Sequence, residues 1–175
     1  MKVRILLFLL FFSCSLSKAQ DYDLQMIRAT FFNLTFDSKN TPAFYDQLQT
    51  IEDPMPIIKA YLGATQALMV KHVWSPFGKW KYLRMSEKTL TEAVNNSPKN
   101  VEIRFIRFSV EKNIPHMFGF SEHLEGDKAY ILDNIKRFDV SDLDEDYLDY
   151  IINFFEEQGE LTQMELERIK KTLKS

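Results

Sequence analysis

The chain has 175 residues, of which 45% are hydrophobic, and a formal net charge of −3 at pH 7. This length suits one domain with a hydrophobic core of its own. The acidic balance and the absence of a long basic block in the sequence argue against general nucleic-acid binding, which needs a dense positive surface.

The first nineteen residues have the layout of a secretory signal peptide. Lys2 and Arg4 give a basic start, an apolar run follows over residues 5–12, and residues 17–19 (Ser-Lys-Ala) place small residues before the expected cleavage site. The run falls short of the about 20 residues that cross a bilayer, so we expect no transmembrane segment in the mature chain. The sequence therefore predicts a cleaved signal peptide over 1–19, a single helical domain over 20–175, and export to the periplasm or the medium.

The single cysteine, Cys14, lies within this expected signal peptide. The mature domain then has no thiol that could form a disulfide or hold a metal. The alternative is a lipoprotein in which Cys14 carries a lipid anchor after cleavage. Ser13 suits the position before such a cysteine, but Phe11 and Phe12 replace the small and branched residues usual there. We therefore favour the form without a lipid anchor.

Beyond residue 20 the pattern indicates helices throughout. The chain has only 5 glycines, and no alternation of strand length is bounded by hairpin turns. Apolar residues recur at helical spacing, and short connections favour antiparallel neighbours. The sequence predicts an all-α fold of about eight helices in antiparallel hairpins. The expected helices span residues 21–35, 42–52, 55–73, 76–96, 101–112, 121–137, 142–157 and 162–174.

Particular residues mark the ends of these helices. Thr162 and Glu165 have the spacing of a capping box. Gly159 is expected to close the preceding helix in the left-handed conformation. Other side-chain oxygens can accept a hydrogen bond from a free backbone N–H of a first turn. The N-caps expected on this ground are Thr41, Ser75, Asn100, Ser121 and Ser141.

The helix expected over 101–112 is apolar on two sides, which predicts a central position. Arg104 and Arg107 lie between the apolar stripes, three residues apart on one face. Two guanidinium groups so placed could grip a carboxylate or phosphate of a ligand. The interpretation we favour is that they pair with acids of neighbouring helices. The two stripes are Val101, Phe105 and Phe108, and Ile103, Ile106 and Val110.

The stretch Leu90–Arg104, with the sequence LTEAVNNSPKNVEIR, resembles the junction between two tetratricopeptide repeats. Ala93 and Pro98 match in spacing the alanine and the proline with which that family lets helices approach and closes a repeat. Leu62-Gly63 is similar to its Leu-Gly pair, at a longer separation than a repeat of about 34 residues has. The resemblance implies a TPR-like, superhelical stack of hairpins that binds proteins or peptides. The chain also looks like uncharacterised exported helical proteins of the Bacteroidetes, which implies no activity.

Both tryptophans of the chain lie in an aromatic turn that contains Trp74, Phe77, Trp80 and Tyr82. Clustered Trp and Tyr side chains are typical of binding hot spots, because they bury a large area with little loss of rotamer freedom. The alternative, which we favour, is that these side chains fill the end of a helix hairpin as core. The three-residue spacing of Phe77 and Trp80 fits such packing.

The apolar loop over residues 113–120 contains His116, and His123 follows it. Two histidines without cysteine neighbours or a helical spacing do not make a metal site, and we expect the loop to fold under the helices. The acids over 139–146 lack the glycine and the final acid of a calcium loop and suit the first turn of a helix. The sequence therefore predicts no metal and no cofactor.

The sequence contains no nucleophile elbow, phosphate loop or zinc-protease helix. We expect an exported, non-enzymatic helical scaffold that binds a protein or peptide partner in the cell envelope, with the aromatic turn as first candidate for the contact. The alternative is an envelope enzyme or small-ligand binder that uses a pocket around His116, Arg104 and Arg107. A deep pocket that joins these three residues would favour the alternative, whereas a shallow groove lined by Trp74, Trp80 and surface polar groups would favour the scaffold.

Overall fold

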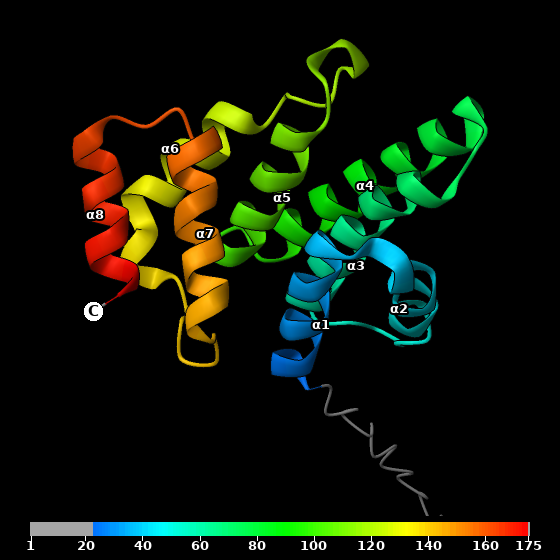
Figure 1. Ribbon diagram of the computed structural model, residues 1–175, viewed down its shortest axis with the longest axis horizontal. Helices are drawn as coiled ribbons and strands as arrows, with labels where there is room; N and C mark the ends of the chain where they lie inside the picture. Colours follow the sequence, from blue (N-terminus) through cyan, green and yellow to red (C-terminus); the bar gives the residue numbers. More distant parts are fainter. Residues whose placement is uncertain (1–22, 175) are drawn as a thin grey trace, which may run out of the picture.

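The computed structural model describes residues 23–174 (Figure 1). The expected signal peptide over 1–19, the cleavage site after Ala19 and the alternative lipid attachment at Cys14 lie outside the described residues. The fold is therefore the fold of the expected mature domain.

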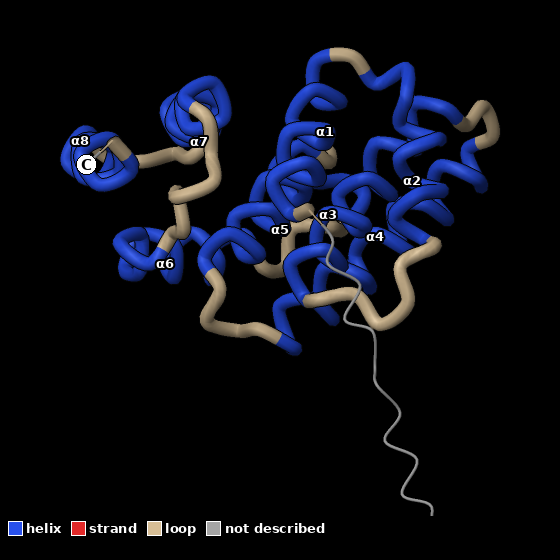
Figure 2. The backbone as a smooth tube through the Cα atoms, turned by 90° about the horizontal axis from the view of Figure 1, so that it is seen from below, coloured by secondary structure: helices blue, strands red, loops and turns tan. Residues whose placement is uncertain are grey.

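The described part of the chain is all-α, as the sequence predicts (Figure 2). Residues 23–174 form eight α-helices and four short 3-10 turns, with no strand among them. The α-helices are α1 (Leu24–Phe36), α2 (Thr41–Gln49), α3 (Pro56–Leu68), α4 (Pro76–Asn96), α5 (Val101–Asn113), α6 (Leu124–Asn134), α7 (Glu145–Gln158) and α8 (Gln163–Leu173). The 3-10 turns are η1 (Ser38–Asn40), η2 (Met69–His72), η3 (His116–Phe118) and η4 (Ile135–Arg137).

Three of the expected helix starts are confirmed. The hydroxyl of Ser75 accepts a hydrogen bond from the backbone N–H of Gly78 at 3.0 Å and so caps α4. Asn100 caps α5 in the same way. Thr162 and Glu165 form the reciprocal capping box at the start of α8. These caps satisfy first-turn N–H groups that have no partner within the helix.

The caps expected at Ser141 and Ser121 are wrong. The hydroxyl and the backbone N–H of Ser141 both donate to Asp139 Oδ1, at 2.7 and 3.1 Å, in a local turn before α7. The N-cap of α7 is Asp144, whose carboxylate accepts from a first-turn N–H. The α6 helix begins only at Leu124, three residues after Ser121. Polar residues are crowded before both helices, so a serine was not the only available cap.

Two other expected helix ends also differ. Thr41 is the first residue of α2 rather than its N-cap, and its hydroxyl donates to the carbonyl of Ser38 at 2.7 Å. Gly159 ends α7 with φ −71°, a right-handed value. The left-handed residue is the next one, Glu160, with φ 51°. The chain therefore reverses one residue later than the glycine suggests.

The α5 helix separates two hydrophobic cores, which confirms the prediction of a central helix. Its residues Ile103 and Ile106 belong to a core built mainly with α1, α2, α3 and α4. Val101, Phe105 and Phe108 belong to a second core built with α6, α7 and α8. The two apolar stripes of α5 thus serve two different sets of partners. Figure 1 shows α5 between α6, α7 and α8 on one side and α3 and α4 on the other.

Within the first core, α3 packs against α1, α2, α4 and α5. Its closest approach to α4 lies at Gly63, where an added Cβ would come within 2.8 Å of Leu90 Cγ. Ala93, one turn further along α4, is completely buried. The α3–α4 pair is therefore a tightly packed helix hairpin, while its kinship with tetratricopeptide repeats stays a prediction.

A buried polar network connects the two halves of the fold. Glu102 of α5 accepts hydrogen bonds from Arg28 of α1, at 2.9 and 2.6 Å, and from the hydroxyl of Tyr61 of α3, at 2.7 Å. The hydroxyl of Tyr61 lies 3.0 Å from that of Tyr147 in α7. Burial raises the pKa of Tyr61 and of Tyr147, and the nearby Glu102 carboxylate reinforces both shifts. One carboxylate thus helps to fix four helices.

Candidate functional site

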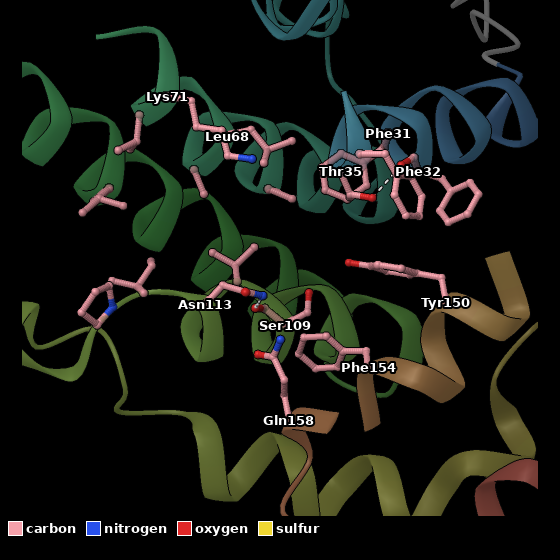
Figure 3. Close-up of a pocket in the computed structure, with 18 of the residues that line it drawn as sticks. Phe31, Phe32, Thr35, Leu68, Lys71, Ser109, Asn113, Tyr150, Phe154 and Gln158 are labelled. Atoms are coloured by element: carbon pink, nitrogen blue, oxygen red, sulfur yellow. Dashed lines mark hydrogen bonds between the residues drawn. The ribbon is translucent and has the colours of Figure 1, made fainter. Parts of the chain in front are cut away.

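The main hollow of the fold is a cavity of about 1280 Å³, open to solvent as a groove. Residues of α1, α3, η2 and the start of α4 line one side of it, and residues of α5, α7 and the loop after α5 line the other (Figure 3). These segments come from both halves of the chain. The groove is therefore a product of tertiary packing.

Aromatic side chains dominate one end of the groove. Phe31 and Phe32 of α1 face Tyr150 and Phe154 of α7 across the opening (Figure 3). The rings of Phe32 and Tyr150 lie 5.5 Å apart, edge to face. At the rim, Phe36 keeps 72% of its surface exposed although it is apolar. This end is therefore a partly buried aromatic cluster with one exposed ring, Phe36, at its rim.

The middle of the groove is lined by small residues and by amides. Ala64 and Ala67 of α3 lie on one side, and Ser109 of α5 on the other. Asn113 and Gln158 gather near Ser109 (Figure 3), and Asn113 donates a hydrogen bond to the carbonyl of Ser109 at 2.8 Å. Amide side chains donate and accept at once, as a peptide bond does. The middle therefore combines free space with groups that match a polypeptide backbone.

The two rims of the groove carry opposite charges. Lys71 and Lys79 line the α4 side, whereas Asp146, Asp149 and Glu157 line the α7 side. Asp149 pairs with Lys174, the residue after α8, at 2.7 Å. The other four make no ion pair within the described part of the chain. Their charges remain available to a ligand that lies between the rims.

The aromatic turn lies largely outside the core, so the expectation that it fills the end of a hairpin is wrong for two of its residues. Trp74 is 99% exposed and Phe77 is 80% exposed. Trp80 is partly covered, because its ring packs against Phe120 at 5.4 Å and under the guanidinium of Arg84 at 4.6 Å. Trp74 and Trp80 both line the groove, whereas Phe77 does not.

Arg104 and Arg107 are engaged in structural ion pairs, as we favoured from the sequence. Both bind Asp127 of α6, with distances of 2.7 to 2.8 Å. The guanidinium of Arg104 also lies 4.2 Å from the centre of the Tyr130 ring. Neither arginine lines the groove, and the side chain of His116 is outside what the structure describes. The described residues thus do not bring together the pocket of the alternative hypothesis.

The described residues contain no group of three or more His, Cys, Asp or Glu side chains able to hold a metal. His123 instead binds Glu111, with its Nδ1 2.7 Å from Glu111 Oε1 and its backbone N–H donating to Oε2. Burial raises the pKa of Glu111, although the hydrogen bonds from His123 oppose this shift. Of the helices in residues 23–174, none has the length and hydropathy of a membrane span.

Sequence reasoning found Trp74 and Trp80 but missed the aromatic residues of α1 and α7. Phe32 and Tyr150 are more than a hundred positions apart, and no local pattern connects them. One signal was available: Phe31, Phe32 and Phe36 cover more than one face of a single helix. A surplus of aromatic residues around a helix indicates that one face serves something other than the core.

The groove has to be interpreted from its own chemistry. No protein-family model, curated protein or solved structure matches the chain. The resemblance to tetratricopeptide repeats and to exported Bacteroidetes proteins therefore stays at the level of the sequence motifs that suggested it.

Proposed function

We propose that the protein is an exported, non-enzymatic helical scaffold whose groove binds an apolar segment of a protein or peptide partner in the cell envelope. The observation that carries this proposal is the open groove of about 1280 Å³ with aromatic residues at both ends. Its volume exceeds the range of roughly 300–1,000 Å³ typical of small-molecule pockets. Exposed Trp, Tyr and Phe side chains are typical of surfaces that recognise other polypeptides.

The shape and chemistry of the groove support a polypeptide ligand. Aromatic side chains near Trp80 at one end and Tyr150 at the other can each take a large apolar side chain. Between them, Ala64 and Ala67 leave room for a backbone, and Asn113 can satisfy its polar groups. A segment with two bulky side chains a few residues apart fits this arrangement.

The cellular part of the proposal rests on residues 1–19, whose basic start, apolar run and small residues fit a signal peptide. The described domain contains no cysteine. Its stability therefore comes from its two cores and from the Glu102 network, without disulfides. N-terminal mass analysis of the exported chain tests this step: Gln20 at the terminus supports it, and an acylated Cys14 replaces it with the lipoprotein form.

The groove itself is tested with a displayed library of random peptides. The peptides selected on the wild-type domain are then tested for binding to two variants. Ala67→Trp fills the middle of the groove, and Lys88→Trp adds the same side chain at an exposed site on α4. We expect Ala67→Trp to lose the peptides and Lys88→Trp to keep them. Equal binding by both variants contradicts a groove site.

A further inference from the structure

At the opening of the groove the molecule presents exposed apolar side chains, which we call the aromatic tip. It consists of Trp74 and Phe77 before and in the first turn of α4, and of Met117 and Phe118 in the loop after α5. Trp74 is 99% exposed, Phe77 80% and Met117 86%. Side chains this exposed contribute almost nothing to the core, so their surface is free to contact something outside the chain.

The two segments of the aromatic tip are neighbours in space. The ring contact between Trp80 and Phe120, at 5.4 Å, holds the start of α4 against the loop after α5. Trp74 and Phe118 both line the same groove. Figure 1 shows the start of α4 and this loop on the same side of the molecule. The exposed apolar side chains of the two segments therefore flank the same groove from its two sides.

The charged residues within the two segments of the aromatic tip are all basic, although Arg84 pairs with Glu87 of the next turn at 2.7 Å. Residues 71–85 contain Lys71, Lys79, Lys81 and Arg84 and no Asp or Glu, and the loop over 113–120 adds no acid. The whole chain, by contrast, has a net charge of −3. An aromatic surface with lysines around it thus occurs in one place on an acidic protein. This local positive charge requires an anionic partner surface.

We propose that the aromatic tip docks onto the anionic surface of a lipid bilayer. Trp and Phe side chains favour the boundary between headgroups and acyl chains, and lysines beside them are attracted by anionic lipids. The two side chains that reach furthest, Trp74 and Met117, come from different segments, so the domain would rest on two points. This inference goes beyond the peptide-binding groove and does not depend on it. Docking would place one end of the groove next to the membrane.

Intrinsic tryptophan fluorescence can follow the contact with a membrane, because Trp74 and Trp80 are the only tryptophans of the chain. Trp80→Phe leaves Trp74 as the single tryptophan. The chain from Gln20 onward keeps every described residue and removes the apolar run over 5–12. We expect its emission to shift to shorter wavelength with phosphatidylglycerol vesicles and to stay unchanged with phosphatidylcholine vesicles. The shift should weaken as salt rises.

Co-sedimentation with the same vesicles tests which residues contribute to membrane binding. Lys79→Glu/Lys81→Glu should weaken binding to phosphatidylglycerol vesicles by about 25-fold or more, since each lysine near an anionic surface contributes about fivefold. Lys88→Glu, an exposed charge reversal further along α4, should have a smaller effect. Trp74→Ser/Phe77→Ser should lose binding, whereas Met164→Ser, which removes an apolar side chain that is 80% exposed on α8, should keep it.

Three results would overturn the proposal. The first is absence of any shift of Trp74 emission with phosphatidylglycerol vesicles. The second is equal loss of binding in the aromatic-tip variants and their matched controls. The third is a shift of Trp74 emission with groove-binding peptides but not with vesicles, which would assign the aromatic tip to a polypeptide partner. Circular dichroism confirms that each variant keeps its helices.

Discussion

The buried carboxylate of Glu102 is the most sensitive point of the fold. Glu102 and Arg28 are 4% and 3% exposed, and they form a bidentate ion pair between α5 and α1. Burial lowers the pKa of Arg28, but the hydrogen bond and the charge of Glu102 outweigh this effect and raise it overall. The arginine is therefore charged in the folded state, and Glu102 is the buried carboxylate that accepts its hydrogen bonds.

Glu102→Leu removes that carboxylate and leaves a buried guanidinium whose remaining ion-pair partner is the largely exposed Asp142, 3.7 Å away. Breaking a buried ion pair in this way costs about 3–5 kcal/mol. Since a domain of this size is stable by about 5–15 kcal/mol, the variant should lose a large part of its stability. Arg28→Met/Glu102→Leu, which removes both charges, should recover most of the loss because no unpaired charge remains.

Urea unfolding followed by circular dichroism measures both variants. The matched control is Glu92→Gln, which breaks the more exposed pair of Lys59 and Glu92, 3.4 Å apart. That change should cost no more than about 1 kcal/mol. The reasoning is refuted if Glu102→Leu costs no more than the control, or if the double variant is as unstable as the single one.

Three further predictions concern the hairpin, the last helix and the aromatic turn. Gly63→Ala should destabilise the domain by about 1–3 kcal/mol in urea unfolding, because its Cβ would lie 2.8 Å from Leu90 Cγ and 3.3 Å from the Leu90 backbone nitrogen. Thr162→Ala should lower Tm and raise the pKa of Glu165 part of the way to its usual value, because it keeps the hydrogen bond from the Thr162 backbone N–H, the largest cause of the lowered pKa, and removes the one from the hydroxyl. Because that pKa is lowered by folding, the contribution is present above about pH 4.5 and is lost as the pH falls, so a pH series of Tm in both proteins checks it. Trp74→Ala should change the free energy of unfolding by no more than about 0.5 kcal/mol, since the side chain is exposed; a loss of several kcal/mol would show that it is core after all.

The helices of this fold are predictable because their signals are local. Asn100 marks the start of α5, and the spacing of Phe105 and Ile106 shows that both sides of this helix are buried. The predictions of a cap at Ser141 and of a left-handed helix end at Gly159 are wrong, because neighbouring residues can take the same role there. Asp144 caps as well as a serine does, and Glu160 adopts the left-handed conformation without being glycine. The spacing of residues in the sequence does not show which of several adjacent residues will cap or end a helix.

The binding surface is harder to predict, because exposure depends on what another element covers. Phe77 and Trp80 have the spacing of a packed face, yet only Trp80 has a partner, Phe120, forty residues later in the chain. The ion pairs of Arg104 and Arg107 were easier to foresee, since two guanidinium groups on a half-buried helix face need an acid nearby. Which acid it is, Asp127, follows only from the packing of α6.

The Glu102 network lies next to the aromatic end of the groove, because the same two helices, α1 and α7, contribute residues to both. In α7, Tyr147 belongs to the network and Tyr150, three residues later on the same face, lines the groove. In α1, Phe32 lines the groove and follows Arg28 of the network by four residues, again on one helix face. The Phe32 ring lies 5.2 Å from that of Tyr147. The network therefore holds the aromatic end of the groove at a fixed width.

This coupling leads to a last prediction, which separates stability from binding. Arg28→Met/Glu102→Leu should be nearly as stable as the wild type but should lose the directional bonds that set α1 against α7, because apolar contacts do not specify one geometry. Peptides selected on the wild-type groove should then bind this variant more weakly, although the groove residues Phe32 and Tyr150 are unchanged. Calorimetric titration of a selected peptide into both proteins measures the difference. Unchanged affinity in a stable double variant would show that packing alone sets the width of the groove.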